Sequence, residues 1–220
     1  MSTRVKRVGT RDERGAALVE FAIAVPILIA LLALIFDAGL GYSAARSSSS
    51  AARSSALVGA RAGESRDADY RALDALLAEF GKNNRTPAEI EQIVQRVVIY
   101  RSEPGGNGEP PDACTSSTNT PAAACNVYSG SDLANLNQAD FEGVQTLPGG
   151  KVVCASSSKD VAWCPLQRRD DEGSFLGVYV ETTSEAAIGI GTDDFKLGDR
   201  AVFSMYFLPE PVPLGSPSAP

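Results

Sequence analysis

The sequence has no histidine, and its first cysteine is Cys114. Histidine is the commonest general base and the commonest metal ligand, so its absence lowers the expectation of an enzyme or a metal centre. Basic residues are also scarce, since 20 lysines and arginines stand against 27 acidic residues, for a net charge of −7. A nucleic-acid-binding protein needs a basic face. We therefore expect no catalytic residues, no metal or other cofactor, and no nucleic-acid partner.

Charge is absent from residues 21–36, inside an apolar segment that runs from Ala16 to Tyr42. About 20 apolar residues are enough for a helix to cross the hydrocarbon core of a bilayer. Glu20 and Asp37 flank the uncharged stretch and lie 17 positions apart, which is about 25 Å along a helix axis. Both carboxylates can therefore lie near opposite membrane interfaces. Pro26 falls inside the helix, where membrane helices tolerate it.

Residues 1–15 are polar and carry five basic side chains against two acidic ones. Positive charge flanking a membrane helix stays in the cytoplasm. The sequence therefore predicts a cytoplasmic leader, a single membrane pass and an exported C-terminal domain.

All four cysteines follow the apolar segment. An even number of cysteines in an exported region predicts disulfide bonds. Three pairings are possible, and we favour nearest neighbours: Cys114 with Cys125, and Cys154 with Cys164. A zinc site is the weaker alternative, because no two of these cysteines have the tight spacing of structural zinc motifs.

Residues 41–62 are rich in alanine, serine and arginine and contain no proline. Alanine has the highest helix propensity, so we expect the membrane helix to continue through this segment as a stem and to stop at Gly63. The alternative is a flexible tether.

The exported region alternates helical and strand patterns. Residues 67–80 have apolar side chains at helical spacing. Thr86 to Glu89 forms a capping box with proline at the first helical position. A short helix then leads into a β-branched strand at residues 97–100, and residues 103–125 are expected to form a loop.

Two short strands are expected at residues 151–155 and 160–163, joined by the second disulfide. Stronger strand patterns cover residues 175–182 and 200–208. We therefore predict an α+β fold in which a long N-terminal transmembrane and stem helix precedes a small disulfide-bearing domain. The expected segments are a leader at 1–15, the transmembrane helix and stem at 16–62, the extracytoplasmic domain at 63–208 and an exposed proline-rich tail at 209–220.

Two groups of acidic residues invite comparison with calcium sites. One group is Asp170, Asp171 and Glu172, and the other is Asp193, Asp194 and Asp199. Neither has the alternating ligands and terminal glutamate of a calcium-binding loop. We interpret both as solvated acidic loops, and we expect Trp163 to pack on the neighbouring disulfide.

The most specific pattern lies at the start of the apolar segment. The basic leader ends in Gly15, Ala16 follows, and Glu20 stands at the fifth position after that glycine. This arrangement resembles the prepilin signature of type IV pilin-like proteins. The resemblance implies that a prepilin peptidase cuts between Gly15 and Ala16 and that Glu20 pairs with the terminal amine of a neighbouring subunit during assembly.

The stretch RGAALVEFAIAVPILIALLALIFDAG resembles the TadE-like pseudopilins of tight-adherence pilus systems more closely. The resemblance covers about 26 of 220 residues. It implies a protein of the bacterial cytoplasmic membrane. The implied protein is a minor pilin or pseudopilin, which is a structural or assembly component of a bacterial adhesion pilus and not an enzyme. The implied partners are membrane lipid, other pilin-like subunits and the prepilin peptidase.

Other interpretations remain open from the sequence. Glu20 can be an interfacial carboxylate with no role in assembly. An ordinary secretory signal cut near residues 43–45 would release a secreted domain. An uncut anchor would leave a membrane-tethered binding module outside the cell.

Overall fold

The computed structural model describes residues 12–82, 85–103, 105, 107–115, 125–146, 148–150, 152–154, 163–170, 175–184 and 195–205. The expected leader residues 1–11 and the expected tail at 209–220 lie outside these ranges. So do residues 155–162, which include most of one expected strand.

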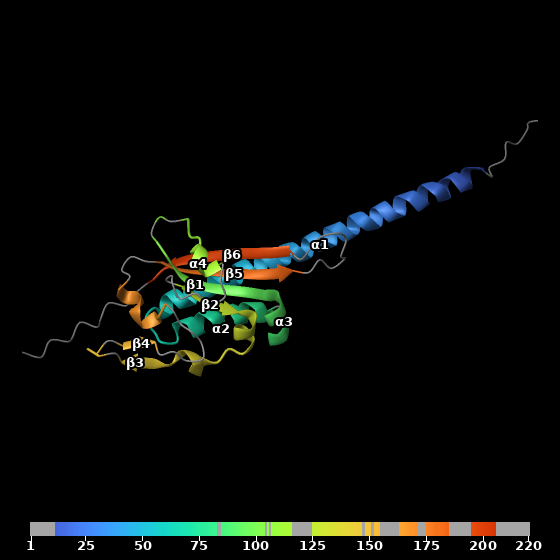
Figure 1. Ribbon diagram of the computed structural model, residues 1–220. Coiled ribbons are helices and arrows are strands. Elements are labelled where there is room, and N and C mark those ends of the chain that lie inside the picture. The colour runs from blue at the N-terminus through green and yellow to red at the C-terminus, as the bar shows by residue number, and fades with distance from the viewer. Residues whose placement is uncertain are drawn as a thin grey trace, which may run out of the picture.

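One helix, α1 (Asp12–Ala62), forms both the apolar segment and the stem. It begins four residues before Ala16 and runs unbroken through Pro26 and the serine-rich stretch. Gly63 ends it with a φ of 53°, a left-handed conformation that glycine adopts without steric cost. The prediction of a continuous helix is therefore confirmed, and the flexible tether is excluded. The first half of α1 projects away from the rest of the molecule (Figure 1).

The second half of α1 packs against α2 (Ala68–Gly81) and against strands β5 (Phe175–Ser184) and β6 (Phe195–Ser204). The chain then continues through α3 (Pro87–Ile93), which has the capping box expected at Thr86 and Glu89. The remaining short elements are α4 (Asp112–Thr115), α5 (Gly130–Ala134), and the 3-10 helices η1 (Gln138–Phe141) and η2 (Pro165–Asp170).

The main sheet has the order β2-β1-β5-β6, with antiparallel pairing throughout, and includes β1 (Val94–Ser102) and β2 (Cys125–Ser129). Both faces of β1 are buried. Val97 and Ile99 lie in the core beneath α1 and α2, whereas Val98 and Tyr100 lie in a smaller cluster with the first disulfide. Burial on both faces explains why this strand is a continuous apolar run instead of an alternating one.

A second sheet consists of β3 (Val144–Thr146) and β4 (Val152–Cys154). The strand expected at residues 151–155 corresponds to β4, whereas the strand expected at 160–163 lies almost wholly outside the described residues. The partner of β4 is β3, and Trp163 lies in a bend just before η2. The expected strand at 200–208 begins earlier, at Phe195.

The fold is therefore an α+β domain in which a helical hairpin of α1 and α2 covers one face of an antiparallel sheet (Figure 1). The domain includes two disulfides.

Candidate functional site

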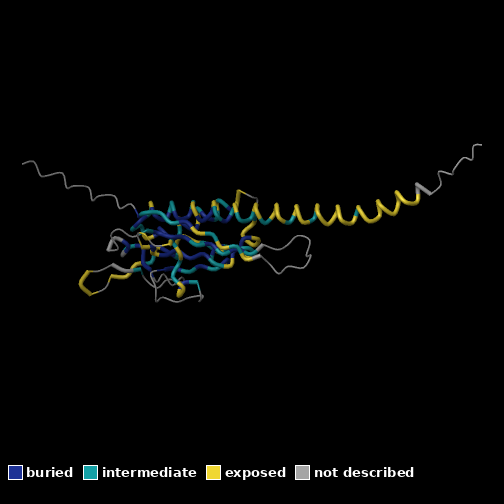
Figure 2. Tube along the Cα trace, turned by 90° about the horizontal axis from the view of Figure 1, so that it is seen from above, coloured by how far each residue is buried: buried dark blue, intermediate teal, exposed yellow. Residues whose placement is uncertain are grey.

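The first half of α1 exposes nearly all of its large apolar side chains. Figure 2 shows this part of the helix as an almost unbroken exposed stretch. The exposed side chains include leucine, isoleucine and phenylalanine residues from Leu18 to Leu40, followed by Tyr42. This helix is long and apolar enough to cross a membrane. Side chains of this kind need an apolar environment that the domain itself does not supply.

Gly15, Ala16 and Glu20 lie within little more than one turn of α1, and all three are exposed. Among the described residues, no side chain or backbone group forms a hydrogen bond with the Glu20 carboxylate. Ala16 and Glu20 are four positions apart, so they lie on the same face of the helix. Ala16 and Glu20 therefore share one accessible face of α1, with Gly15 exposed next to Ala16, at the far end of the molecule from the domain.

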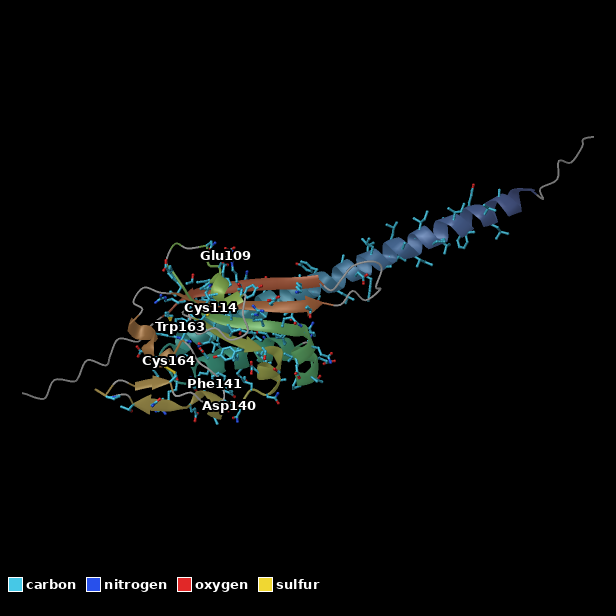
Figure 3. All side chains as sticks on the ribbon, viewed as in Figure 1. Glu109, Cys114, Asp140, Phe141, Trp163 and Cys164 are labelled. Carbon is cyan, nitrogen blue, oxygen red and sulfur yellow. A yellow bond between two sulfur atoms is a disulfide. The ribbon has the colours of Figure 1, made fainter. Side chains whose placement is uncertain are left out.

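Cys114 and Cys164 lie in the domain, far from that helix end (Figure 3), and the four cysteines form two disulfides. Cys114 bonds to Cys125 with an S–S distance of 2.04 Å, and Cys154 bonds to Cys164 with 2.09 Å. These are the nearest-neighbour pairs that the sequence favours. The first joins α4 to β2, and the second joins β4 to the residue that precedes η2. Both disulfides therefore link segments within the domain, and neither involves α1.

Sequence reasoning missed a buried polar cluster beneath α2. The Asp69 carboxylate accepts hydrogen bonds from Arg168 Nη2 at 2.6 Å, Asn126 Nδ2 at 2.5 Å and Tyr128 Oη at 2.9 Å. The side chains of Asp69 and Arg168 are 1% and 0% exposed. The guanidinium carbon of Arg168 lies 4.2 Å from the centre of the Trp163 ring, so this cation faces the indole.

The cluster is completed by the backbone of Trp163, whose N–H donates to Asn126 Oδ1 at 2.7 Å and whose carbonyl accepts from Asn126 Nδ2 at 2.9 Å. Burial and the adjacent Asp69 carboxylate raise the pKa of the Tyr128 hydroxyl well above its ordinary value. The cluster connects α2, β2 and the segment from Trp163 to η2. Its closed and fully buried geometry makes it a structural connection, since a ligand has no access to it.

One sequence signal pointed toward this cluster. Asp69 stands four and seven positions before Leu73 and Leu76, so it lies on the buried face of α2. A carboxylate on that face needs a buried cationic partner. Nothing in the sequence identifies the partner as Arg168, because it lies 99 positions away in the short 3-10 helix η2.

The two acidic groups lie largely outside the described residues, so the expectation that they bind no calcium stays a prediction. Within the ranges that the structure describes, no group of three histidine, cysteine, aspartate or glutamate residues could hold a metal ion. Asp171, Glu172, Asp193 and Asp194 lie outside those ranges.

These features define a class of protein. Within the described residues, one helix is long enough to span a membrane. Its first half is apolar and exposed, and its second half packs into an α+β domain. Residues 15–57 match the family model of TadE-like proteins. The match covers the exposed helix and most of its buried continuation, and it confirms the resemblance drawn from Gly15, Glu20 and the apolar run. It supports a pseudopilin associated with a tight-adherence pilus. No curated protein and no solved structure matches the chain significantly.

Proposed function

We propose that this chain is a minor pilin or pseudopilin that serves as a structural or assembly component of a tight-adherence pilus. The observation that carries the proposal is the register of Gly15, Ala16 and Glu20 at the exposed start of a continuous apolar helix within the TadE-like match. The role is structural and not enzymatic. Its partners are membrane lipid, other pilin-like subunits and a prepilin peptidase.

Processing comes first in the proposed mechanism. The peptidase cuts between Gly15 and Ala16 on the cytoplasmic side and leaves the Ala16 amine as the new terminus. Both residues are exposed on α1, which supports access. Removal of the leader takes away the basic residues that hold the N-terminus in the cytoplasm.

Assembly follows through the helix. Glu20 has no hydrogen-bond partner among the described residues of its own chain, and an unpaired charge in an apolar setting is costly. Pairing with the terminal amine of a neighbouring subunit offsets part of that cost. The exposed apolar side chains of α1 would then pack against other helices, so that subunits exchange lipid contacts for protein contacts.

N-terminal sequencing of the mature protein tests the processing step. We expect the mature chain to begin at Ala16. A start near Ala45 would indicate an ordinary secretory signal and a soluble domain. A start at Met1 or Ser2 would indicate an uncut anchor, and the processing step would be wrong.

Substitution of Glu20 tests the assembly step. Glu20→Ala and Glu20→Gln should leave membrane insertion intact and strongly reduce piliation, because both remove the charge. Asp37→Asn removes the carboxylate at the opposite end of the apolar run and should retain piliation. Normal piliation in both Glu20 variants would contradict the assembly role.

A further inference from the structure

A polar pocket lies where α1 leaves the domain. Its volume is about 580 Å³. Ala44 and Ser48 of α1 form one wall, and Arg85, Gln95, Thr183 and Lys196 are among the residues that form the others. The pocket therefore lies between α1, the segment around α3, and one end of the β5–β6 pair. That end is the one nearest the projecting half of α1.

The position of the pocket along α1 sets its depth relative to a membrane. Leu40 ends the run of exposed aliphatic side chains, and Tyr42 is 71% exposed. Tyrosine favours the boundary between hydrocarbon and headgroups. Ala44 is four positions beyond Leu40, about 6 Å along the axis. Each headgroup layer is roughly 5–7 Å thick, so the wall formed by Ala44 lies at the level of the lipid headgroups.

A hydrogen-bonded framework holds the wall of the pocket in place. Ser48 Oγ and Thr182 Oγ1 are 3.0 Å apart and buried, which fixes α1 to β5. Gln95 Nε2 donates to Thr183 Oγ1 at 3.3 Å, and Thr183 Oγ1 lies 3.4 Å from the carbonyl oxygen of Gln92. The wall is thus built from neutral hydrogen-bonding groups that already have fixed positions.

Two cations complete the pocket. Arg85 lies with its guanidinium carbon 5.6 Å from the centre of the Phe80 ring, and Lys196 stands opposite Thr183 in the β5–β6 ladder. Neither cation forms an ion pair within the described part of the chain. Glu89 also borders the pocket. Its carboxylate accepts hydrogen bonds from Thr86 N at 2.6 Å and Thr86 Oγ1 at 3.0 Å, and these bonds, with a smaller effect of the Arg85 charge, lower its pKa. Two cations, one already engaged carboxylate and several neutral polar groups match the needs of a phosphate diester.

We propose that this pocket binds the phosphate group of a membrane phospholipid, with Arg85 and Lys196 as its cationic contacts. At headgroup depth, lipid phosphates are the anions present at the highest local concentration. Bound lipid would fix the height and tilt of the domain above the membrane. The inference rests on the membrane placement of α1 in the proposed function, but not on processing or on assembly by Glu20.

Lipid binding to the full chain tests the inference. The protein, purified in detergent, would be titrated with phosphatidylglycerol, with diacylglycerol of the same acyl chains, and with inorganic phosphate, and bound species would be counted by native mass spectrometry. We expect phosphatidylglycerol to bind, diacylglycerol not to bind, and inorganic phosphate to compete with the lipid. Equal binding of diacylglycerol and phosphatidylglycerol would overturn the proposal. If inorganic phosphate bound and phosphatidylglycerol did not, the pocket would be a site for free phosphate and the proposal of a lipid ligand would be wrong.

Matched variants separate the pocket from net charge. Arg85→Gln combined with Lys196→Gln should weaken phosphatidylglycerol binding by roughly 30-fold, because each basic side chain near an anionic headgroup contributes about fivefold. Arg61→Gln combined with Arg66→Gln makes the same change in charge at the opposite end of the domain and should bind as wild type. Unchanged fluorescence of Trp163, the only tryptophan, would show that each variant is folded.

Equal losses in the two double variants, or no loss in the first, would overturn the proposal. This outcome is distinct from failure of the proposed function, because the Glu20 variants are expected to bind lipid normally whether or not pili form.

Discussion

The two halves of α1 belong to one helix but differ in the side chains that they carry and in whether the domain buries those side chains. The first half carries large aliphatic side chains and exposes them, whereas the second half carries alanine, serine and glycine and buries them. Ala51, Ala52 and Ala56 are fully buried. Small residues allow α2 and the sheet to approach the helix closely, so contact area comes from backbone proximity instead of side-chain size. The large side chains of the first half need burial by lipid or by other helices.

The two halves also differ in how charge is handled. Glu20, in the first half, has no hydrogen-bond partner among the described residues. Asp69, in the domain that packs against the second half, accepts three hydrogen bonds from Arg168, Asn126 and Tyr128. The first arrangement leaves a charge available to another molecule, and the second uses a charge to hold one domain together. The comparison implies that removing a carboxylate should affect assembly when the residue is Glu20 and domain stability when it is Asp69.

Asp69→Ala is expected to have the largest effect on stability. It leaves the Arg168 guanidinium buried without its carboxylate, a change that costs about 3–5 kcal/mol in buried ion pairs. The measurement is urea unfolding of the full chain in detergent, followed by Trp163 fluorescence. Asp74→Ala, on the exposed face of the same helix, should change the free energy of unfolding by less than about 0.5 kcal/mol. Equal effects of the two substitutions would show that the buried cluster does not stabilise the domain.

A pair of glycine substitutions compares the two halves of α1 directly. A Cβ atom at Gly59 would lie 3.1 Å from the Cβ atom of Ala72 and 3.3 Å from a methyl carbon of Leu176, whereas a Cβ atom at Gly39 would meet nothing within 4 Å. Gly59→Leu should therefore destabilise the domain by about 1–3 kcal/mol through overpacking. This loss outweighs the gain of roughly 0.8 kcal/mol in helix propensity.

Gly39→Leu is the matched control in the exposed half. It should leave the urea midpoint of the domain unchanged, because no domain residue lies near it. A comparable loss in both variants would mean that α1 responds as a single unit and that the contrast between its halves is wrong.

The sequence predicts the parts of this fold that depend on local signals. Alanine content and Gly63 predict the length of α1, and Thr86 with Glu89 predicts the start of α3. Prediction from the sequence fails where an element or a partner is determined by contacts between residues far apart in the chain. The start of β6 is missed because Lys196 and Gly198 are exposed at the edge of the sheet, where the apolar alternation that identifies a strand disappears. The partner of β4 and the partner of Asp69 are also set by tertiary packing.

The candidate site divides in the same way. Gly15, Ala16 and Glu20 form a local motif that the sequence shows directly. The pocket beside Arg85 and Lys196 could not be predicted, because its walls come from segments more than 100 positions apart. Only folding brings Ser48 next to Thr182.

The smallest expected effect concerns alkaline pH and compares Tyr100 with Tyr42. Burial raises the pKa of the Tyr100 hydroxyl from 10.0 to about 12, with Arg200 acting in the opposite direction and Glu109 adding to the rise. Between these two values the unfolded chain loses the proton and the folded chain keeps it. The folded state then binds more protons, so the contribution of Tyr100 to stability is complete below pH 10.0 and is lost as the pH rises toward about 12.

Urea unfolding at about pH 9 and about pH 11 measures this loss. Tyr100→Phe removes the hydroxyl that donates to the carbonyl of Gly108, so it should lower stability at the lower pH by about 1 kcal/mol. The variant should then lose less stability than wild type between the two pH values, because it has no phenol to titrate at this position. Tyr42→Phe changes an exposed residue of the membrane half and should keep the wild-type pH dependence. If the Tyr100 variant kept that dependence as well, alkaline unfolding would have to originate from another group of the domain, such as Tyr128, whose hydroxyl pKa is also raised by burial.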